Sequence, residues 1–516
     1  MSKERTSKKQ LAINLIAALM NFIVVAGINF VLTPLLSKEL GDEAYGFIGL
    51  ANNFASYASI LSVALNSMSA RFISIEFHKG NTEKAKEYFN SVFIADLIMG
   101  IFLTVVSVFI IFNITSIVNI SSNLVLDVQI TFGIVFANTI VTIINSVYGV
   151  AVFVVNRLDL NSIRLIISKM INILVLLILF FLFKPKIFYI SIATIIATIF
   201  VSFENIKLTH RLIPELNINF RGFKLKAVKE IISSGIWNAI NHLSSLLLTG
   251  LDLIIANLFI DSKNMGILSV AKTIPSAFLA LLGTISNIFT PVFTTLYAQG
   301  KKEELVKEVK FSIKVFSLIM TVPIIGFIVF GYEFYSLWMP YRSSEEIMQI
   351  QILSILTLAP NIFSSYIYSL YSINTVTNKL KVPVLLTMGI SILSTITVLI
   401  LVNTTNLGVY AVAGVSSFYL ILRILFFVPT YAAHNLELPL FTFYKPFLRA
   451  IGCSGILAIA FWVIKSFITI DSWADLIFIG FLAGVTGYIL NIILLLNNTE
   501  RNQLKGIIKE KFVRGK

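Results

Sequence analysis

The sequence has little charge and almost no cysteine or histidine. Only 13% of its 516 residues are Asp, Glu, Lys or Arg, whereas soluble domains carry about 25%. Its single cysteine, Cys453, excludes an intramolecular disulfide. The four histidines and this cysteine form no pattern with metal-site spacing, and no nucleotide-binding motif occurs. We therefore expect no metal, no cofactor and no enzymatic activity, and a soluble enzyme is excluded.

Long apolar runs are what the sequence has instead, with 57% hydrophobic residues. About 20 apolar residues cross a bilayer as a helix, and these runs predict an all-α polytopic membrane protein with about 14 transmembrane helices. Of the 40 Lys and Arg residues, 31 then fall on one side and six on the other. The positive-inside rule predicts that both termini are cytoplasmic. The net charge of +14 thus reflects topology, and we expect no nucleic-acid partner.

A shift of 220 residues aligns the two halves of the chain. It places Gly46-Phe47-Ile48-Gly49-Leu50-Ala51 on Gly266-Ile267-Leu268-Ser269-Val270-Ala271, and Gly80 on Gly300. Each copy would contain six helices beginning on the same side, which predicts two parallel repeats followed by two C-terminal helices. The expected divisions are an N-terminal bundle at 1–210, a basic cytoplasmic linker at 211–227 and a C-terminal bundle at 228–430. Helices 13 and 14 and a basic tail would follow at 431–516.

Several motifs resemble the Wzx-like polysaccharide flippases of the multidrug/oligosaccharidyl-lipid/polysaccharide exporter superfamily. They lie at 34–41, Tyr45-Gly46, Ala70-Arg71, 252–255, 265–271 and 291–304. The resemblance implies two six-helix bundles around a cavity lined by helices 1, 2, 7 and 8. It also implies a multi-pass protein of the bacterial plasma membrane that flips polyprenyl-diphosphate-linked oligosaccharide to the outer leaflet by alternating access. Membrane lipids, a polysaccharide polymerase and glycosyltransferases are the implied partners. Related lipid II flippases carry arginines in lining helices, but helix 1 here has none.

Polar residues follow one face of the predicted helix 7, where Asn238, His242, Ser245, Thr249 and Asp252 are spaced by three or four residues. Together with polar residues of helices 1, 2 and 8, they give the candidate substrate-binding residues Lys272, Asp252, Asn241, Asn21, Asn52 and Asn238. Alternatively, such side chains only join helices by hydrogen bonds.

Ionisable residues inside the membrane are functional candidates because a buried charge is costly. Lys272 is expected either to meet a diphosphate or to pair with Asp252. His242 and Asp96 are candidates for ion coupling, although a lone histidine can also be a packed residue. Arg423, in the predicted span 408–430, is expected to extend toward the nearby cytoplasmic surface.

Two other functions remain open at this stage. A multidrug or cation antiporter of the same superfamily has a similar fold but usually stops at twelve helices. A membrane polysaccharide polymerase would be expected to carry a sizeable extramembrane loop with His, Arg or acidic residues, and the loops here are short.

Overall fold

A computed structural model describes residues 2–497 and 500–501. Every regular element among these residues is a helix. Thirteen of the described helices are long and apolar enough to cross a membrane, and the number rises to 14 when one bent pair is counted as a single span. The predicted fold class, an all-α polytopic membrane protein with about 14 spans, is confirmed.

The helices divide between two compact units. The first unit comprises Met1–Val270 and Lys381–Ser416, and the second comprises Ala271–Leu380 and Ser417–Lys516. The expected bundles 1–210 and 228–430, the linker 211–227 and the C-terminal segment 431–516 stay predictions.

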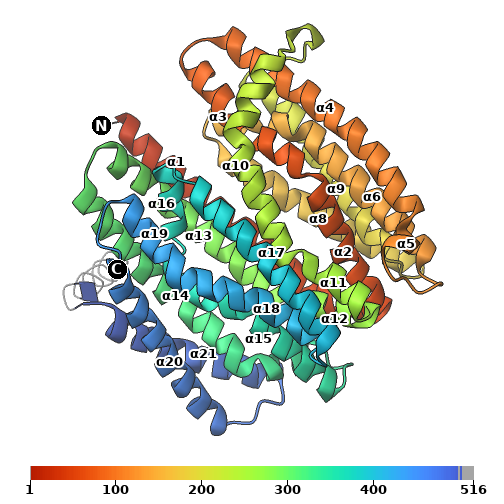
Figure 1. Ribbon diagram of the computed structural model, residues 1–516, viewed down its shortest axis with the longest axis vertical. Coiled ribbons are helices and arrows are strands. Elements are labelled where there is room, and N and C mark those ends of the chain that lie inside the picture. The colour runs from red at the N-terminus through yellow and green to blue at the C-terminus, as the bar shows by residue number, and fades with distance from the viewer. Residues whose placement is uncertain (1, 498–499, 502–516) are drawn as a thin grey trace, which may run out of the picture. The chain divides into compact units, whose positions relative to one another are not determined.

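The first half of the chain contains the following elements: α1 (Ser2–Leu40), α2 (Asp42–Ala58), α3 (Ile60–His78), α4 (Thr82–Phe112), α5 (Ile114–Ile117), α6 (Val125–Asn145), η1 (Ser146–Gly149), α7 (Val150–Val154), α8 (Leu158–Leu182), α9 (Phe188–Leu212), η2 (Phe220–Gly222), α10 (Leu225–Thr249) and α11 (Leu251–Phe259). Within the first unit α4, α6 and α9 lie side by side, and α10 packs against α3 and α17 (Figure 1).

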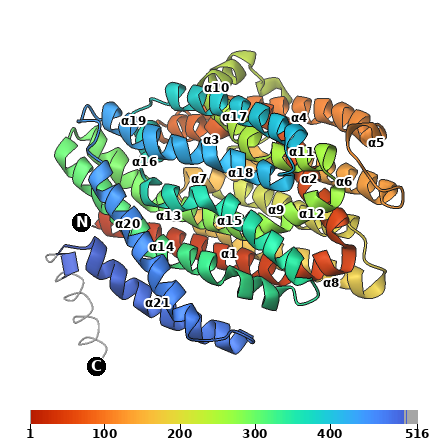
Figure 2. The same ribbon diagram turned by 60° about the horizontal axis from the view of Figure 1, so that its bottom comes forward.

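The second half contains α12 (Ser262–Ala271), α13 (Thr273–Ala298), α14 (Lys302–Trp338), α15 (Ser344–Ile367), α16 (Leu370–Val376), α17 (Lys381–Thr404), α18 (Val409–Leu422), η3 (Arg423–Phe427), α19 (Val428–Asn435), α20 (Tyr444–Ser466) and α21 (Trp473–Leu495). Within the second unit α14 packs against α15, α20 and α21, and Figure 2 shows α20 and α21 beside it.

The second predicted span is bent rather than straight. The pair α2 and α3 is bent by 65° close to Ser59, where three serine hydroxyls donate to carbonyls of the preceding turn. Ser56 donates to Asn52, Ser59 to Ser56, and Ser62 to Ser59. Such bonds back to the helix are a known cause of bending.

Two loops related by the 220-residue shift have the same backbone conformation. Gly80 has φ 79° and Gly300 has φ 70°, a left-handed conformation that glycine adopts without steric cost. The next residue donates back to the preceding helix in both loops, from Asn81 to Glu76 and from Lys301 to Leu296, as in a Schellman motif. This shared geometry supports the internal repeat.

Candidate functional site

The predicted polar face of helix 7 is only partly exposed in α10. Asn241, Ser245 and Thr249 are exposed, and the two hydroxyls bond to carbonyls of their own helix. Asn238 is half-buried, and its Nδ2 donates to Ser67 Oγ of α3 at 3.2 Å. His242 is half-buried. This helix therefore presents several polar groups at its surface and uses one of them to join α3, while their role in substrate binding stays a prediction.

Two candidate asparagines lie on α1 and α2. Asn52 is exposed and donates to Ile48 of its own helix at 2.9 Å. Asn21 is half-buried, and its Oδ1 is buried without a hydrogen-bond partner among the described residues. Their roles in substrate binding stay predictions.

The span that contains Asp252 is broken at Gly250, between α10 and α11. Side chains of α2 satisfy the carbonyls at this break: Asn53 Nδ2 donates to Gly250 at 2.8 Å, and the Tyr57 hydroxyl donates to Leu246 at 3.0 Å. Broken helices persist at membrane depth only when their backbone groups are satisfied in this way. Asp252 lies buried in the first turn of α11. The sequence did not single out Asn53 or Tyr57, although Asn53 directly follows Asn52.

Lys272 is half-buried and occupies the joint between α12 and α13. It belongs to the second unit, whereas Asp252 belongs to the first. Both the ion pair between them and a contact of Lys272 with diphosphate stay predictions.

Asp96 lies at the centre of a buried polar cluster in the first unit. Its side chain is fully buried in α4 and accepts hydrogen bonds from Asn66 Nδ2 at 3.1 Å and Ser146 Oγ at 2.9 Å. Ser146 comes from the 3-10 turn η1, which interrupts the fourth span. Asn66 Oδ1 is buried and has no partner among the described residues. The cluster thus combines a carboxylate with a further oxygen that is free to accept or to ligate.

The two copies of the repeated Gly-containing segment touch each other within the first unit. A Cβ atom added at Gly46 would lie 2.9 Å from Gly266 Cα, and one added at Gly49 would lie 3.0 Å from Ser269 Oγ. A Cβ atom at Gly266 would lie 2.0 Å from the carbonyl oxygen of Asp42. Only glycine allows so close an approach of α12 to α2.

A reciprocal pair of asparagines contributes further bonds in the same unit. The Asn119 backbone N–H donates to Asn257 Oδ1 at 2.8 Å, and each side-chain amide donates to the other backbone carbonyl, at 3.0 and 2.9 Å. Asn119 follows α5, and Asn257 lies in α11. The positive-inside count puts these residues and the glycine contact on the predicted outer side, and we call the two together the outer contact. Neither asparagine was singled out from the sequence.

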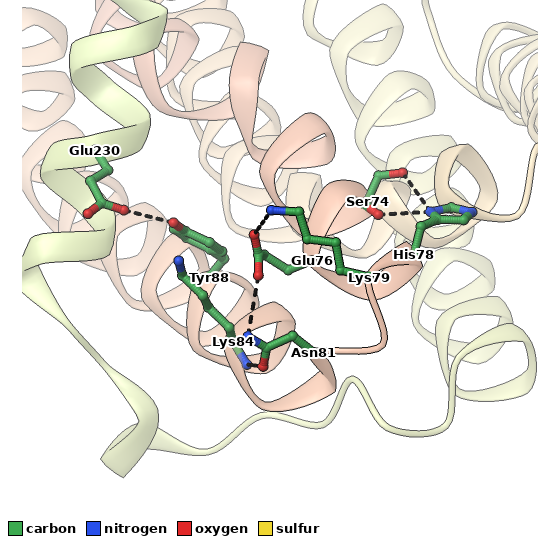
Figure 3. A network of polar contacts seen from close by, with 8 residues as sticks. All are labelled: Ser74, Glu76, His78, Lys79, Asn81, Lys84, Tyr88 and Glu230. Atoms are coloured by element: carbon green, nitrogen blue, oxygen red, sulfur yellow. Dashed lines mark hydrogen bonds and ion pairs between the residues drawn. The ribbon is translucent and has the colours of Figure 1, made fainter.

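At the predicted cytoplasmic end, α10 contacts α4 (Figure 3). The Tyr88 hydroxyl donates to Glu230 Oε2 at 2.7 Å. Lys84 Nζ lies 5.7 Å from the centre of the Tyr88 ring, and close by Glu76 accepts from Lys79 at 3.0 Å. Helices of the first and second repeats are thus joined near both ends of the predicted spans.

Comparison with known proteins decides the family. A family model described as polysaccharide biosynthesis protein matches residues 11–297, which is more than half of the chain. The chain belongs to this family. It is 27% identical over 482 residues to the uncharacterized membrane protein EpsK of Bacillus subtilis (strain 168), which covers 91% of this chain and 92% of the relative.

Two solved structures show that the fold of this family member is shared more widely. The lipid II flippase MurJ in an inward closed conformation has a TM-score of 0.69 at 17% identity, with 93% of this chain and 97% of that one covered. An inward-facing multidrug resistance MATE family transporter of the MOP superfamily has a TM-score of 0.66 at 14% identity, with 83% and 98% covered. This chain is thus a multi-pass membrane protein of the polysaccharide biosynthesis family, and it shares its fold with solved transporters of the MOP superfamily.

Proposed function

We propose that this transporter flips polyprenyl-diphosphate-linked oligosaccharide from the inner to the outer leaflet for surface polysaccharide synthesis. The observation that carries this proposal is the exposed polar face of α10, formed by Asn241, Ser245 and Thr249. Hydrocarbon disfavours such groups, but water and the hydroxyls of a glycan can hydrogen-bond to them. Membership of a polysaccharide biosynthesis family supports glycan as the cargo.

The outer contact supports alternating access as the mechanism. It joins helices of the two repeats through backbone approach and three hydrogen bonds. Outward release of a glycan would require Gly46 to separate from Gly266 and Asn119 from Asn257. The predicted cytoplasmic contact of Tyr88 with Glu230 would form and separate in the opposite phase.

Individual residues then have proposed roles. Lys272 would bind the diphosphate by charge attraction, which is stronger away from bulk water. Asp96 would hold the coupling cation or proton together with Asn66, and His242 is the alternative coupling group. The setting is the bacterial plasma membrane with both termini in the cytoplasm, where glycosyltransferases supply the substrate and a polymerase receives it.

The test is transport in liposomes containing the purified chain and a fluorescent polyprenyl-diphosphate oligosaccharide. We expect protein-dependent appearance of the glycan on the opposite leaflet, measured by its accessibility to an added glycosidase. Lys272→Ala should abolish flipping without loss of membrane insertion, whereas Lys307→Ala, at an exposed position, should leave it unchanged. Normal flipping by Lys272→Ala would remove Lys272 from the mechanism. Movement of organic cations without glycan would favour the antiporter function instead.

A further inference from the structure

The twelfth predicted span contains a wide helical turn in its middle. The span runs Val409–Asn435, and Arg423–Phe427 form a π-helical turn in which the Val428 N–H donates to the Arg423 carbonyl, five residues back. Pro429 has no N–H, so the carbonyl of Leu425 loses its usual partner four residues ahead. That carbonyl accepts instead from the Tyr444 hydroxyl at 2.7 Å. Pro429 and Tyr444 thereby stabilise a turn of the kind often found at functional sites.

Arg423 is the first residue of this turn. Helix α19 continues to Asn435, twelve residues beyond Arg423, which corresponds to about 18 Å of helix. The helix therefore continues further beyond Arg423 than the apolar run indicated, and the extension of Arg423 toward the cytoplasmic surface stays a prediction. The guanidinium carbon of Arg423 lies 5.6 Å from the centre of the Tyr371 ring.

The guanidinium is incompletely satisfied in this position. Arg423 Nε is buried and has no hydrogen-bond partner among the described residues. A guanidinium has five N–H donors, and the face of the Tyr371 ring attracts its charge without accepting strong hydrogen bonds. A cation inside a membrane protein ordinarily has a counter-charge. The ring alone does not supply one.

A second aromatic ring contacts Tyr371, and hydroxyl groups follow it along the chain in the same unit. Ser372 directly follows Tyr371, and its Oγ lies 2.9 Å from Thr290 Oγ1 and 3.5 Å from Ser286 Oγ of α13. The ring of Tyr368 contacts that of Tyr371, with their centres 5.5 Å apart. Arg423 therefore lies against the ring of Tyr371, which is itself in contact with a second aromatic ring.

We propose that Arg423, beside Tyr371, forms a binding site for a phosphate or diphosphate group. Guanidinium binds phosphate oxygens through paired N–H bonds, and such an anion would supply both the missing acceptor for Nε and the missing counter-charge. The inference rests on the proposed function only for the source of the anion, which would be the diphosphate of the lipid-linked substrate. A phospholipid headgroup offers the same chemistry.

The test is binding to the purified full chain in nanodiscs of neutral lipid, with farnesyl diphosphate as the probe. We expect Arg423→Gln to weaken binding about tenfold or more, and Arg423→Lys to weaken it less, because lysine keeps the charge but loses the paired geometry. The exposed control Lys307→Gln should bind as the original chain does. If Arg423→Gln does not fold, Arg423→Lys is compared with the original chain instead. Weaker binding of farnesyl diphosphate by a stably folded Arg423→Lys then supports the site.

Competition separates the two sources of the anion. Displacement of the probe by inorganic pyrophosphate supports the diphosphate as the ligand, whereas displacement by phosphatidylglycerol alone would overturn the substrate as its source. Binding by Arg423→Gln within twofold of the original chain, with a lower unfolding temperature, would overturn the site and leave Arg423 only a packing role. Because binding is measured without transport, failure of the flipping assay with Arg423-dependent binding intact would count against the proposed function alone.

Discussion

Substitution of Gly266 by alanine should open the outer contact selectively. The added Cβ atom would lie 2.0 Å from the carbonyl oxygen and 2.4 Å from the carbonyl carbon of Asp42. These are backbone atoms, so α2 and α12 must move apart. Overpacking of this kind costs roughly 1–3 kcal/mol, and only the closed arrangement contains the clash. Alanine also favours the helix by up to about 1 kcal/mol, but it does so in both arrangements. The ratio of open to closed molecules should therefore rise about 5- to 150-fold.

The assay is the rate at which a maleimide labels a single cysteine introduced by Met265→Cys, in a chain that also carries Cys453→Ala. Met265 is fully buried, and its side chain lies beside Gly46, so labelling reports the open population. Gly389→Ala is the matched control, because a Cβ atom there would meet nothing within 4 Å. We expect faster labelling only with Gly266→Ala. Equal rates for the two alanine variants would refute the argument from close backbone approach.

Three further outcomes are expected. Asn257→Ala removes the two hydrogen bonds that the Asn257 side chain makes with Asn119, each worth about 1 kcal/mol, so the same cysteine should be labelled at least tenfold faster; an unchanged rate would show that these bonds are not limiting. Asp96→Asn should abolish ion-driven flipping in liposomes while membrane insertion is retained, and full activity would exclude Asp96 as the coupling site. Although burial alone would raise it, the hydrogen bond from Lys314 at 2.7 Å holds the pKa of Glu500 below its ordinary value. Its stabilisation is therefore present above about pH 4.5 and lost as the pH falls through the lowered pKa. The thermal stability of Glu500→Gln should accordingly be lower than that of the original chain at pH 7, and the difference should shrink as the pH falls below about 4.5; a difference that stays constant over this range would contradict this assignment.

The helix count was predictable because bilayer thickness imposes one length on every span. Because apolar runs of this length recur along the whole chain, their number can be counted even where a single boundary is misplaced. The helix of the twelfth span, for example, ends at Asn435 rather than near residue 430. The glycines at 80 and 300 were predictable for a different reason. A left-handed residue at a helix end admits few alternatives to glycine, so the local requirement is visible in the sequence itself.

The partners of the candidate residues were much less predictable. Asp96 was singled out because a carboxylate inside a span is unusual, but its contacts with Asn66 and Ser146 depend on which faces of three helices meet. The breaks near Ser59 and Gly250 were also missed, because apolar composition continues across them. Each break is stabilised by specific hydrogen bonds, and the hydropathy of the sequence does not show which side chains form them.

The clearest sequence match between the repeats has a physical cause that only the structure reveals. The segments beginning at Gly46 and Gly266 are equivalent under the 220-residue shift, and they pack against each other. A segment that contacts its own counterpart places the same steric demand on both copies, so a small residue is needed at both ends of the contact. Lipid-facing positions of the two repeats experience no such demand and can diverge. The similarity of these segments therefore follows from their mutual contact, and the closest match between the copies marks the place where the two repeats meet.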